Sequence, residues 1–389
     1  MFVKYLQNAH KELEILGCDK VGLGILSPKI NHFCFLIENI KAPAAHILKQ
    51  EALACGGDFA LPKEAILSQQ EHYKGILILT QSQSKPLLKK LKIQPFGLKT
   101  LALTIQNHLD NYPQNSQNLR DLQNPQNSKS HKIMGIINAT PDSFYTNSRK
   151  SGKEAFNKIL EMIEEGVDII DIGGASSRPG STFIDEKEEL KRIAPIAEFI
   201  AKESLFQKTI FSIDTYTPKV AQFCLEKGFG MVNDITGFQN PLMQEAVLGY
   251  ECQCVIMHMQ KNPQKMQENP SYDNLFLEID SFFARQIEVL QTKGIHNIIL
   301  DVGIGFGKNL QHNCELIRNL RHFKHFGLPL LVGASRKSLI NEIAPSKIEE
   351  RLGGTLAIHL EALRNGADII RCHDTKEHIQ ALKVWKELF

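Results

Sequence analysis

Short apolar runs alternate with longer amphipathic stretches along the chain from residue 132 onward. The runs predict eight buried strands, at residues 133–137, 168–172, 209–213, 230–232, 254–257, 297–300, 329–332 and 368–370. The stretches between and after them have helical spacing, at 153–165, 187–202, 218–227, 274–293, 310–320, 348–365 and 376–388. Strands that alternate with helices predict parallel pairing through crossover helices, and eight such units fit a closed (β/α)₈ TIM barrel. A doubly wound open sheet is the alternative fold.

The chain before residue 132 differs from the rest in two ways. Residues 106–130 are rich in Asn and Gln and are interrupted by Pro113 and Pro125, which predicts a flexible linker. The preceding residues have a mixed pattern that predicts two helices and three strands, at 3–16 and 44–54, and at 21–26, 33–37 and 75–80. We therefore expect three parts: a smaller N-terminal α/β domain of unassigned role at 1–110, a linker at 111–130 and the barrel at 131–389.

The composition is that of a globular protein, with 42% hydrophobic and 23% charged residues. The net charge of +2 gives no basic surface for nucleic acid or an anionic membrane, so we expect neither partner. No apolar run approaches the roughly 20 residues that span a bilayer, and charges interrupt the N-terminus, unlike a secretory signal. The eight cysteines form no C-x-x-C pair, so we expect buried free thiols in a cytoplasmic protein.

Polar side chains follow nearly every predicted strand of the barrel, and a barrel carries its active site at those carboxyl ends. One set suits a flat heterocycle with an amide-like edge: Asp214, Asn233, Asp301 and Lys337. A second set suits an anion such as phosphate or pyrophosphate: Asn138, Ser177, Arg178, Arg371 and His373. The side-chain oxygen of Asn138 also suits Mg²⁺, which usually accompanies pyrophosphate.

Four further features of this rim have open interpretations. The loop at 303–308 resembles a phosphate loop but fails its spacing, so we expect glycines with positive φ, with Phe306 stacked on a ligand ring or filling the core. Asp171 is expected to tie the second loop. Asp234 either caps a helix or orients its loop, and His258 either packs or binds. Away from the rim, His322 and His325 are expected to be solvated residues rather than a metal pair.

The strand ends carry motifs that resemble those of dihydropteroate synthases. These are IMGIINATPDSFY (133–145), DIIDIGGASSRPGS (168–181), SIDT (212–215), VNDITG (232–237), VIMHMQ (255–260), ILDVGIGFGKN (299–309), LVGASRKSLI (331–340) and IIRCHD (369–374). The resemblance runs in order over residues 132–389. It implies a Mg²⁺-dependent, sulfonamide-sensitive transferase of folate biosynthesis that joins a dihydropterin pyrophosphate to 4-aminobenzoate, releasing pyrophosphate.

The resemblance also implies a role for each site residue. Asp214, Asn233, Asp301 and Lys337 would hold the pterin. Asn138, Arg371 and His373 would hold the pyrophosphate, with Mg²⁺ at Asn138. Ser177, Arg178, Pro179 and Ser338 would line the aminobenzoate pocket. Family members often pair as dimers through barrel helices, so a homodimer is an alternative to a monomer.

Three positions depart from the family pattern. The residues after Phe144 lack the usual aspartate, which leaves Asp142 as the carboxylate of the first loop. Ser177 stands in place of a threonine, and Val302 in place of a proline. Two other functions therefore remain as alternatives: a methyltetrahydrofolate-dependent methyltransferase, which has no need of the anion site, and a pterin-binding protein without catalytic activity.

Overall fold

The structure is a computed structural model that describes residues 1, 3–4, 6, 9–111, 131–139, 148–175, 184–261, 266 and 269–388. The chain divides into two compact units, Met1–Ser128 and Lys129–Phe389, which we describe separately. The predicted linker falls almost entirely outside the described residues.

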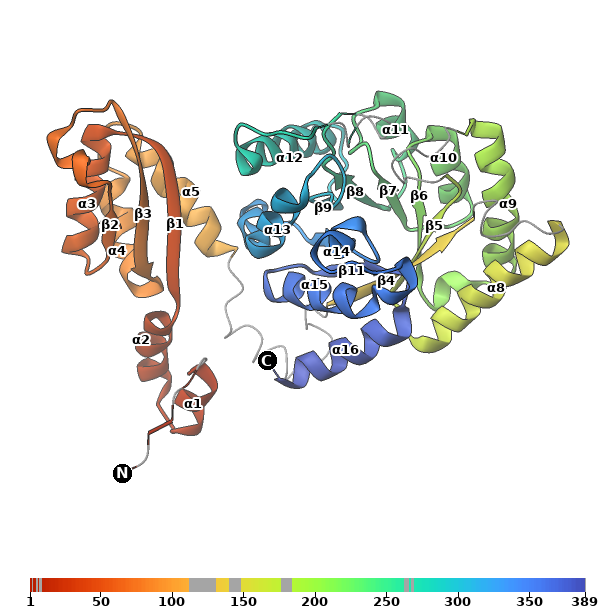
Figure 1. The fold of residues 1–389 in the computed structure, drawn as a ribbon, viewed down its shortest axis with the longest axis horizontal. Coiled ribbons are helices and arrows are strands. Elements are labelled where there is room, and N and C mark those ends of the chain that lie inside the picture. The colour runs from red at the N-terminus through yellow and green to blue at the C-terminus, as the bar shows by residue number, and fades with distance from the viewer. Residues whose placement is uncertain are drawn as a thin grey trace. The chain divides into compact units, whose positions relative to one another are not determined.

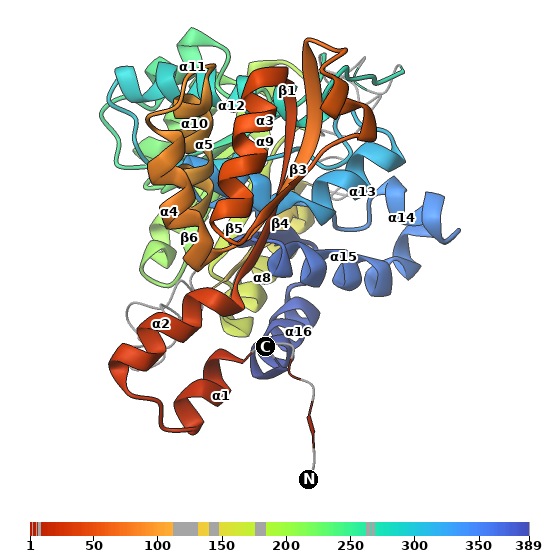
Figure 2. The same ribbon diagram turned by 90° about the vertical axis from the view of Figure 1, so that its left-hand side faces the viewer.

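The N-terminal unit is built on an antiparallel three-stranded sheet of order β1-β3-β2. Its elements are α1 (His10–Ile15), α2 (Lys20–Ile30), β1 (His32–Lys41), α3 (Ala42–Ala54), β2 (Asp58–Ala60), the 3₁₀ helix η1 (Lys63–Leu67), β3 (His72–Thr80), α4 (Gln81–Leu91) and α5 (Leu98–Asp110). Figure 2 shows α3, α4 and α5 beside the long strands β1 and β3. The apolar residues between them, including Leu48, Phe59 and Leu77, are fully buried and form this unit's own core.

One predicted strand in this unit is wrong. Residues 21–26 lie in helix α2, where the side chain of Asp19 accepts hydrogen bonds at 2.8 Å from the backbone N–H groups of Val21 and Gly22. An aspartate at this position stabilises the first turn of a helix, and this local cap outweighs the strand propensity of the apolar run. Of the predicted helix at 3–16, the structure shows α1 from His10 to Ile15. The helix at 44–54 and the strands at 33–37 and 75–80 are confirmed.

The second unit is a closed barrel of eight parallel strands, which excludes the open sheet. The strands are β4 (Lys132–Asn138), β5 (Ile169–Gly173), β6 (Ile210–Asp214), β7 (Met231–Asp234), β8 (Gln253–Met257), β9 (Ile298–Asp301), β10 (Leu330–Val332) and β11 (Ile369–Cys372). Each contains most of one predicted strand. The ring closes where β11 pairs with β4, with Ile370 opposite Ile133.

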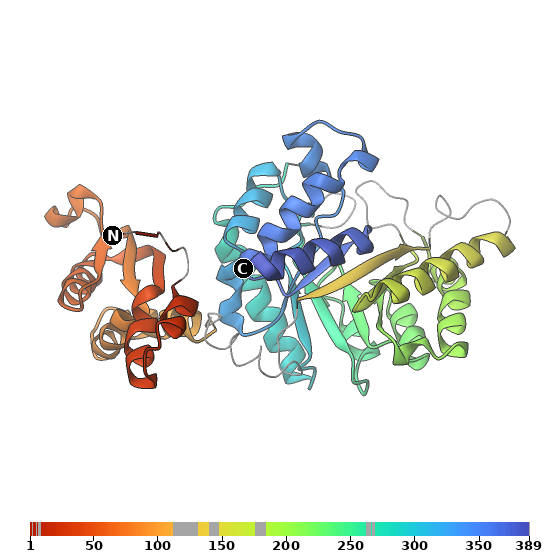
Figure 3. The ribbon, with the colours of Figure 1, turned by 90° about the horizontal axis from the view of Figure 1, so that it is seen from below.

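Helices surround the strands, as Figure 1 shows. They are α8 (Ser148–Glu165), α9 (Glu186–Lys202), α10 (Pro218–Glu226), α11 (Pro241–Ala246), α12 (Leu275–Thr292), α13 (Leu310–Arg318), α14 (Ser338–Ile343), α15 (Leu352–Arg364) and α16 (Thr375–Leu388). Short 3₁₀ helices are η2 (Leu205–Gln207), η3 (Leu320–Phe326) and η4 (Ile348–Glu350). The first and last barrel helices, α8 and α16, lie side by side next to β4 (Figure 3).

The barrel interior is filled by one apolar side chain from each strand. Seven of these are buried (Met134, Ile169, Met231, Val255, Ile299, Leu331 and Ile369), and Ile210 packs against them. Side chains two residues apart on a strand point to the same side of a sheet. The residues that follow this apolar layer by two or four positions therefore also face the barrel axis, toward the carboxyl rim.

Candidate active site

Polar residues follow the apolar layer on several strands, and the two-residue period of a strand points their side chains to the same side as the layer. Asp171, Asn233, Asp301 and Arg371 each lie two positions beyond a layer residue, on β5, β7, β9 and β11. Asp214 lies four positions beyond Ile210 on β6. The strand register therefore directs predicted side chains from several different strands into one shared space.

Arg371 is at the centre of this polar layer. Its Nε donates to Oδ2 of Asp171 and its Nη2 donates to Oδ2 of Asp214, each at 2.6 Å. The amide of Asn233 donates to the same oxygen of Asp171 at 3.1 Å. The structure thus brings together Asp214, Asn233 and Arg371, and Asp171 ties Asn233 to Arg371. This agrees with the structural role expected of Asp171, although that role is in the strand layer rather than only in the loop.

Burial shapes the electrostatics of this network. Desolvation raises the pKa of Asp214 to about 7, against the opposing effect of the Arg371 guanidinium. Desolvation also raises the pKa of Asp301, which Lys337 opposes. For Arg371, desolvation is outweighed by Asp171 and Asp214, so the pKa of its guanidinium is raised and the charge persists. Among the described rim residues, Arg371 is therefore a fixed cation beside the carboxylates of Asp214 and Asp301, whose charge is sensitive to what binds beside them.

Asp301 and Lys337 meet the glycine-rich loop that follows β9. Oδ1 of Asp301 accepts from the backbone N–H of Gly303 at 2.8 Å. The ammonium of Lys337 donates to the carbonyl of Ile304 and lies 4.5 Å from the ring centroid of Phe306. Burial lowers the pKa of Lys337 to about 8. Phe306 is half-buried and packs against this cation.

The glycines of this loop have the positive φ values that were predicted. Gly303 has φ +68°, and a Cβ there would come within 2.0 Å of the carbonyl oxygen of His258. Gly307 has φ +63°, and a Cβ would come within 3 Å of the backbone of Gln260. Any other residue at either position would force the loop away from the segment after β8.

Sequence reasoning missed Lys308, which holds this loop from below. Its ammonium group is buried and contacts Nδ1 of His258 at 3.1 Å and the carbonyl of Phe306 at 3.0 Å. Burial lowers the pKa of Lys308 to about 7 and the pKa of His258 to about 2. His258 therefore packs as a neutral acceptor, and the pair joins the end of β8 to the loop after β9. The sequence alone does not show this role, because it depends on the contact between Lys308 and His258, which are distant in the chain.

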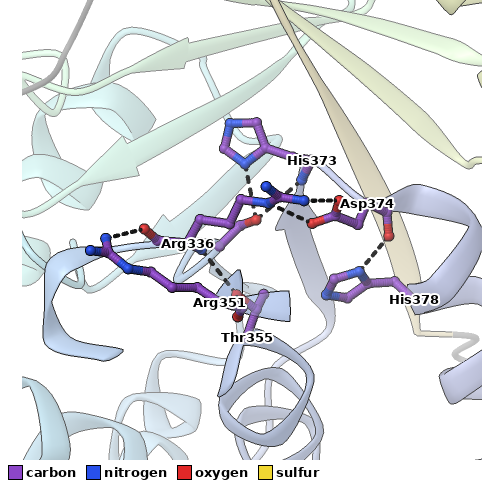
Figure 4. Close-up of polar contacts among 7 residues, drawn as sticks. Arg336, Arg351, Thr355, His373, Asp374 and His378 are labelled. Atoms are coloured by element: carbon purple, nitrogen blue, oxygen red, sulfur yellow. Dashed lines mark hydrogen bonds and ion pairs between the residues drawn. The ribbon is translucent and has the colours of Figure 1, made fainter. Parts of the chain in front are cut away.

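The loops after β10 and β11 form a second cluster, shown in Figure 4. Nδ1 of His373 lies 2.9 Å from Oγ of Ser335, and the backbone N–H of His373 donates to that oxygen at 3.2 Å. Arg336 has φ +57° and donates to both oxygens of Asp374, at 3.0 and 2.5 Å. Ser335 and Arg336 on one loop thus fix His373 and Asp374 on the other.

Two buried histidines support these loops from behind. The backbone N–H of Ala334 donates to Nε2 of His359 at 3.0 Å, so the neutral ring carries its proton on Nδ1. That proton points to Nε2 of His378, 2.8 Å away, and Nδ1 of His378 then donates to the carbonyl of Asp374 at 2.6 Å. Burial lowers the pKa of both histidines, which keeps them neutral and preserves the direction of the chain.

The remaining predicted residues are placed as follows. Asn138 ends β4 next to Gly173, and Ser338 is exposed at the start of α14, adjacent to Lys337. Asp234 orients its own loop, because it accepts from the backbone of Thr236 and Phe238. Ser177, Arg178, Pro179 and Asp142 lie outside the described residues.

Taken together, the fold and rim define a barrel enzyme that presents carboxylate and amide groups beside a fixed guanidinium. The model of the family described as pterin binding enzymes matches residues 134–373. The chain is 44% identical to the bifunctional dihydropteroate synthase/dihydropteroate reductase of Helicobacter pylori, over 98% of this chain and 96% of that protein. It is 43% identical to the dihydropteroate synthase of Escherichia coli, over 65% of this chain and 89% of that protein.

A solved structure has the same barrel. The dihydropteroate synthase of Yersinia pestis, in complex with a sulfonamide drug, has a TM-score of 0.63 and 37% identity, covering 67% of this chain and 94% of that one. The chain therefore belongs to the pterin-binding enzyme family, and the three relatives described above carry the name dihydropteroate synthase, one of them together with dihydropteroate reductase.

Proposed function

We propose that this chain is the transferase of folate biosynthesis that its relatives' names describe, a dihydropteroate synthase. It joins 6-hydroxymethyl-7,8-dihydropterin pyrophosphate to 4-aminobenzoate and releases pyrophosphate. The observation that carries this proposal is the convergence of Asp214, Asn233 and Arg371 on one rim of a barrel of this family. A methyltransferase or an inactive binding protein would not need the cationic groups beside that rim.

The first step of the proposal is the pterin site. Asp214 and Asp301 accept the ring N–H and exocyclic amine of the pterin, because a carboxylate can accept two parallel hydrogen bonds. Asn233 offers both a donor and an acceptor, and Lys337 donates to a carbonyl or ring nitrogen. Phe306, which already packs against Lys337, supplies a flat apolar surface for the ring.

The second step is the leaving group. Arg371 on β11 and His373, just after that strand, would face the pyrophosphate. Asn138 would face it from β4, the strand that pairs with β11. Among the described residues of this set, Asn138 has the side-chain oxygen that can coordinate a metal ion. A single protein ligand fits a Mg²⁺ ion that keeps its waters and binds mainly through substrate phosphates. When bound, Mg²⁺ would neutralise charge that develops on the departing oxygen.

The third step is the attack. Ser177, Arg178, Pro179 and Ser338 are proposed to hold 4-aminobenzoate beside the pterin methylene group. As the C–O bond to pyrophosphate breaks, positive charge develops on the pterin, and the carboxylates of Asp214 and Asp301 stabilise it. The amine nitrogen of 4-aminobenzoate forms the new C–N bond, and its proton passes to the departing pyrophosphate or to water. Two positioned substrates supply much of the rate through proximity, so no covalent intermediate with the chain is needed.

One assay tests the synthase proposal. Purified protein is mixed with Mg²⁺, the pterin pyrophosphate and 4-aminobenzoate, and released pyrophosphate and dihydropteroate are measured in equal amounts. Omitting 4-aminobenzoate should abolish turnover, and a sulfonamide should inhibit competitively with it. Absence of pyrophosphate release with both substrates would reject the proposal, and a methyl transfer from methyltetrahydrofolate would support the methyltransferase instead.

A second activity, dihydropteroate reductase, is favoured by the extent of the match. The relative named for both activities aligns over 98% of this chain, whereas the Escherichia coli synthase aligns over 65%. We propose that the N-terminal unit is needed for this reduction, which adds a hydride and a proton to a C=N bond of the dihydropterin ring. Tetrahydropteroate formation is measured with a reduced nicotinamide or a reduced flavin as donor; no product with either donor would reject it.

The same proposal includes a cytoplasmic location and a homodimer. All eight cysteines are free thiols, as a reducing compartment requires, and no helix in the described ranges is both long and apolar enough to cross a membrane. A groove between α15 and α16 is lined mainly by apolar residues, of which Val384 and Leu388 are well exposed, with charged and polar residues among them. A second copy of the chain would cover it. Light scattering of the wild type and of Val384→Asp checks this, since a monomeric wild type would contradict it.

A further inference from the structure

Away from the rim, three potential metal ligands converge on the outer layer of the barrel. Asp280 lies on α12, and His322 and His325 lie on η3, the 3₁₀ helix before β10. Nε2 of His322 is 2.9 Å from Oδ2 of Asp280, and Nε2 of His325 is 3.1 Å from Oδ1. All three ligand atoms lie within 4.8 Å of one another. None of the three belongs to the catalytic rim.

These separations match a small tetrahedral ion. Zinc binds imidazole nitrogen at about 2.0–2.1 Å and carboxylate oxygen at about 2.0–2.2 Å, which places neighbouring ligand atoms about 3.4 Å apart. The two nitrogen–oxygen distances, each to a different oxygen of the Asp280 carboxylate, are slightly shorter than this value. Taken with one ligand atom from each residue, every separation is at most 4.8 Å. Side-chain shifts of under an ångström or so would bring all three atoms to one ion.

The ligands are also held in place before any ion binds. The ring of His322 makes edge contacts with Phe276 and Phe323, at centroid distances of 5.2 and 5.0 Å. The ring of His325 lies 4.0 Å from that of Phe326. Such contacts restrict rotation of both imidazoles, so little ordering remains to be lost on binding.

We propose that Asp280, His322 and His325 form a binding site for a divalent transition metal, for which zinc is the best match. Two imidazoles with one carboxylate favour zinc over Mg²⁺ or Ca²⁺, which prefer all-oxygen sites. Water completes the tetrahedron. The ion joins α12, which follows β8, to the segment that leads into β10, and it stabilises the outer layer rather than taking part in the transfer reaction.

The competing arrangement has no ion, with both imidazoles simply donating N–H bonds to one carboxylate. Zinc and protons compete for the same Nε2 atoms, so the two arrangements are exclusive and a metal titration separates them. The full chain is stripped with a chelator and then titrated with zinc alone, using a chromophoric competitor to measure affinity. The variants are His322→Gln, His325→Gln and Asp280→Asn, with His296→Gln as the control, because His296 is exposed in the loop after α12.

The wild type and His296→Gln should bind one zinc per chain with equal affinity, and each ligand variant should lose at least about 100-fold in affinity. Zinc should raise the melting temperature of the wild type and of His296→Gln only. Cobalt bound to the wild type should give the intense visible absorption of a tetrahedral ion, a readout that needs no variant to fold. Equal zinc affinity in all variants, or an octahedral cobalt spectrum, would overturn the proposal. Synthase turnover in Mg²⁺ should be unchanged throughout, so this result is independent of the proposed function.

Discussion

The guanidinium of Arg371 donates a 2.6 Å hydrogen bond to Asp214, although 157 positions separate the two residues in the chain. A second bond of the same length joins Arg371 to Asp171. Charge-assisted pairs of this kind fix orientation as well as contributing energy. Asp214 thus carries two tasks in the proposed mechanism: it holds the arginine in place and it presents its carboxylate to the pterin.

Asp214→Asn should weaken binding of the pterin substrate. The neutral amide loses an ionic acceptor for the ring N–H groups and loosens Arg371, and hydrogen bonds to charged groups contribute about 1.5–3 kcal/mol. We expect roughly a 10- to 100-fold rise in Kd by isothermal titration calorimetry. Asp273→Asn, at an exposed carboxylate before α12, serves as the control and should bind normally. Equal affinities in the two variants would reject the assigned contact.

Asp301→Asn should also weaken pterin binding while leaving the fold intact. The amide oxygen can still accept the 2.8 Å bond from Gly303, so the loop after β9 keeps its geometry, whereas the negative charge near Lys337 is lost. We expect about a tenfold or larger rise in Kd with a circular dichroism spectrum like that of the wild type. A large change in the spectrum would instead assign Asp301 to the fold.

The affinity for the pterin should be highest between pH 7 and pH 8, because the pKa of Asp214 is about 7 and that of Lys337 is about 8. Below pH 7, Asp214 gains a proton and loses its anionic acceptor, so affinity falls as the pH drops. Above pH 8, Lys337 loses its charge, so affinity falls as the pH rises. A fluorescence titration across pH 5.5–9.5 should give a narrow maximum. A flat profile through pH 7 in the wild type would contradict the role of Asp214.

The histidine chain behind the β10 and β11 loops predicts a separation between two substitutions. His378→Gln can reproduce both hydrogen bonds, since an amide accepts from His359 and donates to Asp374, and turnover should stay near the wild-type value. His378→Leu leaves Nδ1 of His359 without its acceptor, which costs about 1–3 kcal/mol of stability. Urea unfolding should show this loss, and KM for the pterin pyrophosphate should rise. Identical behaviour of the two variants would show that His378 acts only by filling space.

Removal of residues 1–128 should leave an active synthase. The barrel has its own closed sheet and core, and the Escherichia coli relative, itself a dihydropteroate synthase, aligns with only 65% of this chain. Pyrophosphate release by the shortened chain should match that of the full chain, while reductase activity should disappear. An insoluble or inactive product would show that the barrel requires the N-terminal unit.

The barrel could be predicted from the sequence because its signals are local. Each strand is a short apolar run flanked by an amphipathic helix, and the polar residue at its carboxyl end is adjacent to that run in the sequence. Residues 21–26 show the limit of such signals, because the capping by Asp19 decides between helix and strand and composition does not. Local pattern fails where one hydrogen bond outweighs propensity.

The contacts between strands and helices could not be predicted in the same way. Lys308 contacts His258, which lies 50 positions away in the chain, and Asp280 contacts His322, which lies 42 positions away. The two histidines on η3 were expected to be solvated, because the carboxylate that binds them lies on another element. Contacts of this kind depend on how the barrel curves and brings successive elements together. The hydrophobic pattern of the sequence does not show that curvature, so it does not show which distant residues become neighbours.

Closure of the ring has a consequence for how activity is acquired. Arg371 is on the last strand, and its partners are on the second and third strands of the barrel, up to 200 positions earlier. The guanidinium can reach them only after β11 has docked against β4 and the ring of strands has closed. A nascent chain or a partly opened barrel therefore lacks the arrangement proposed to bind the departing pyrophosphate. Catalytic turnover requires the closed barrel rather than any fragment of it.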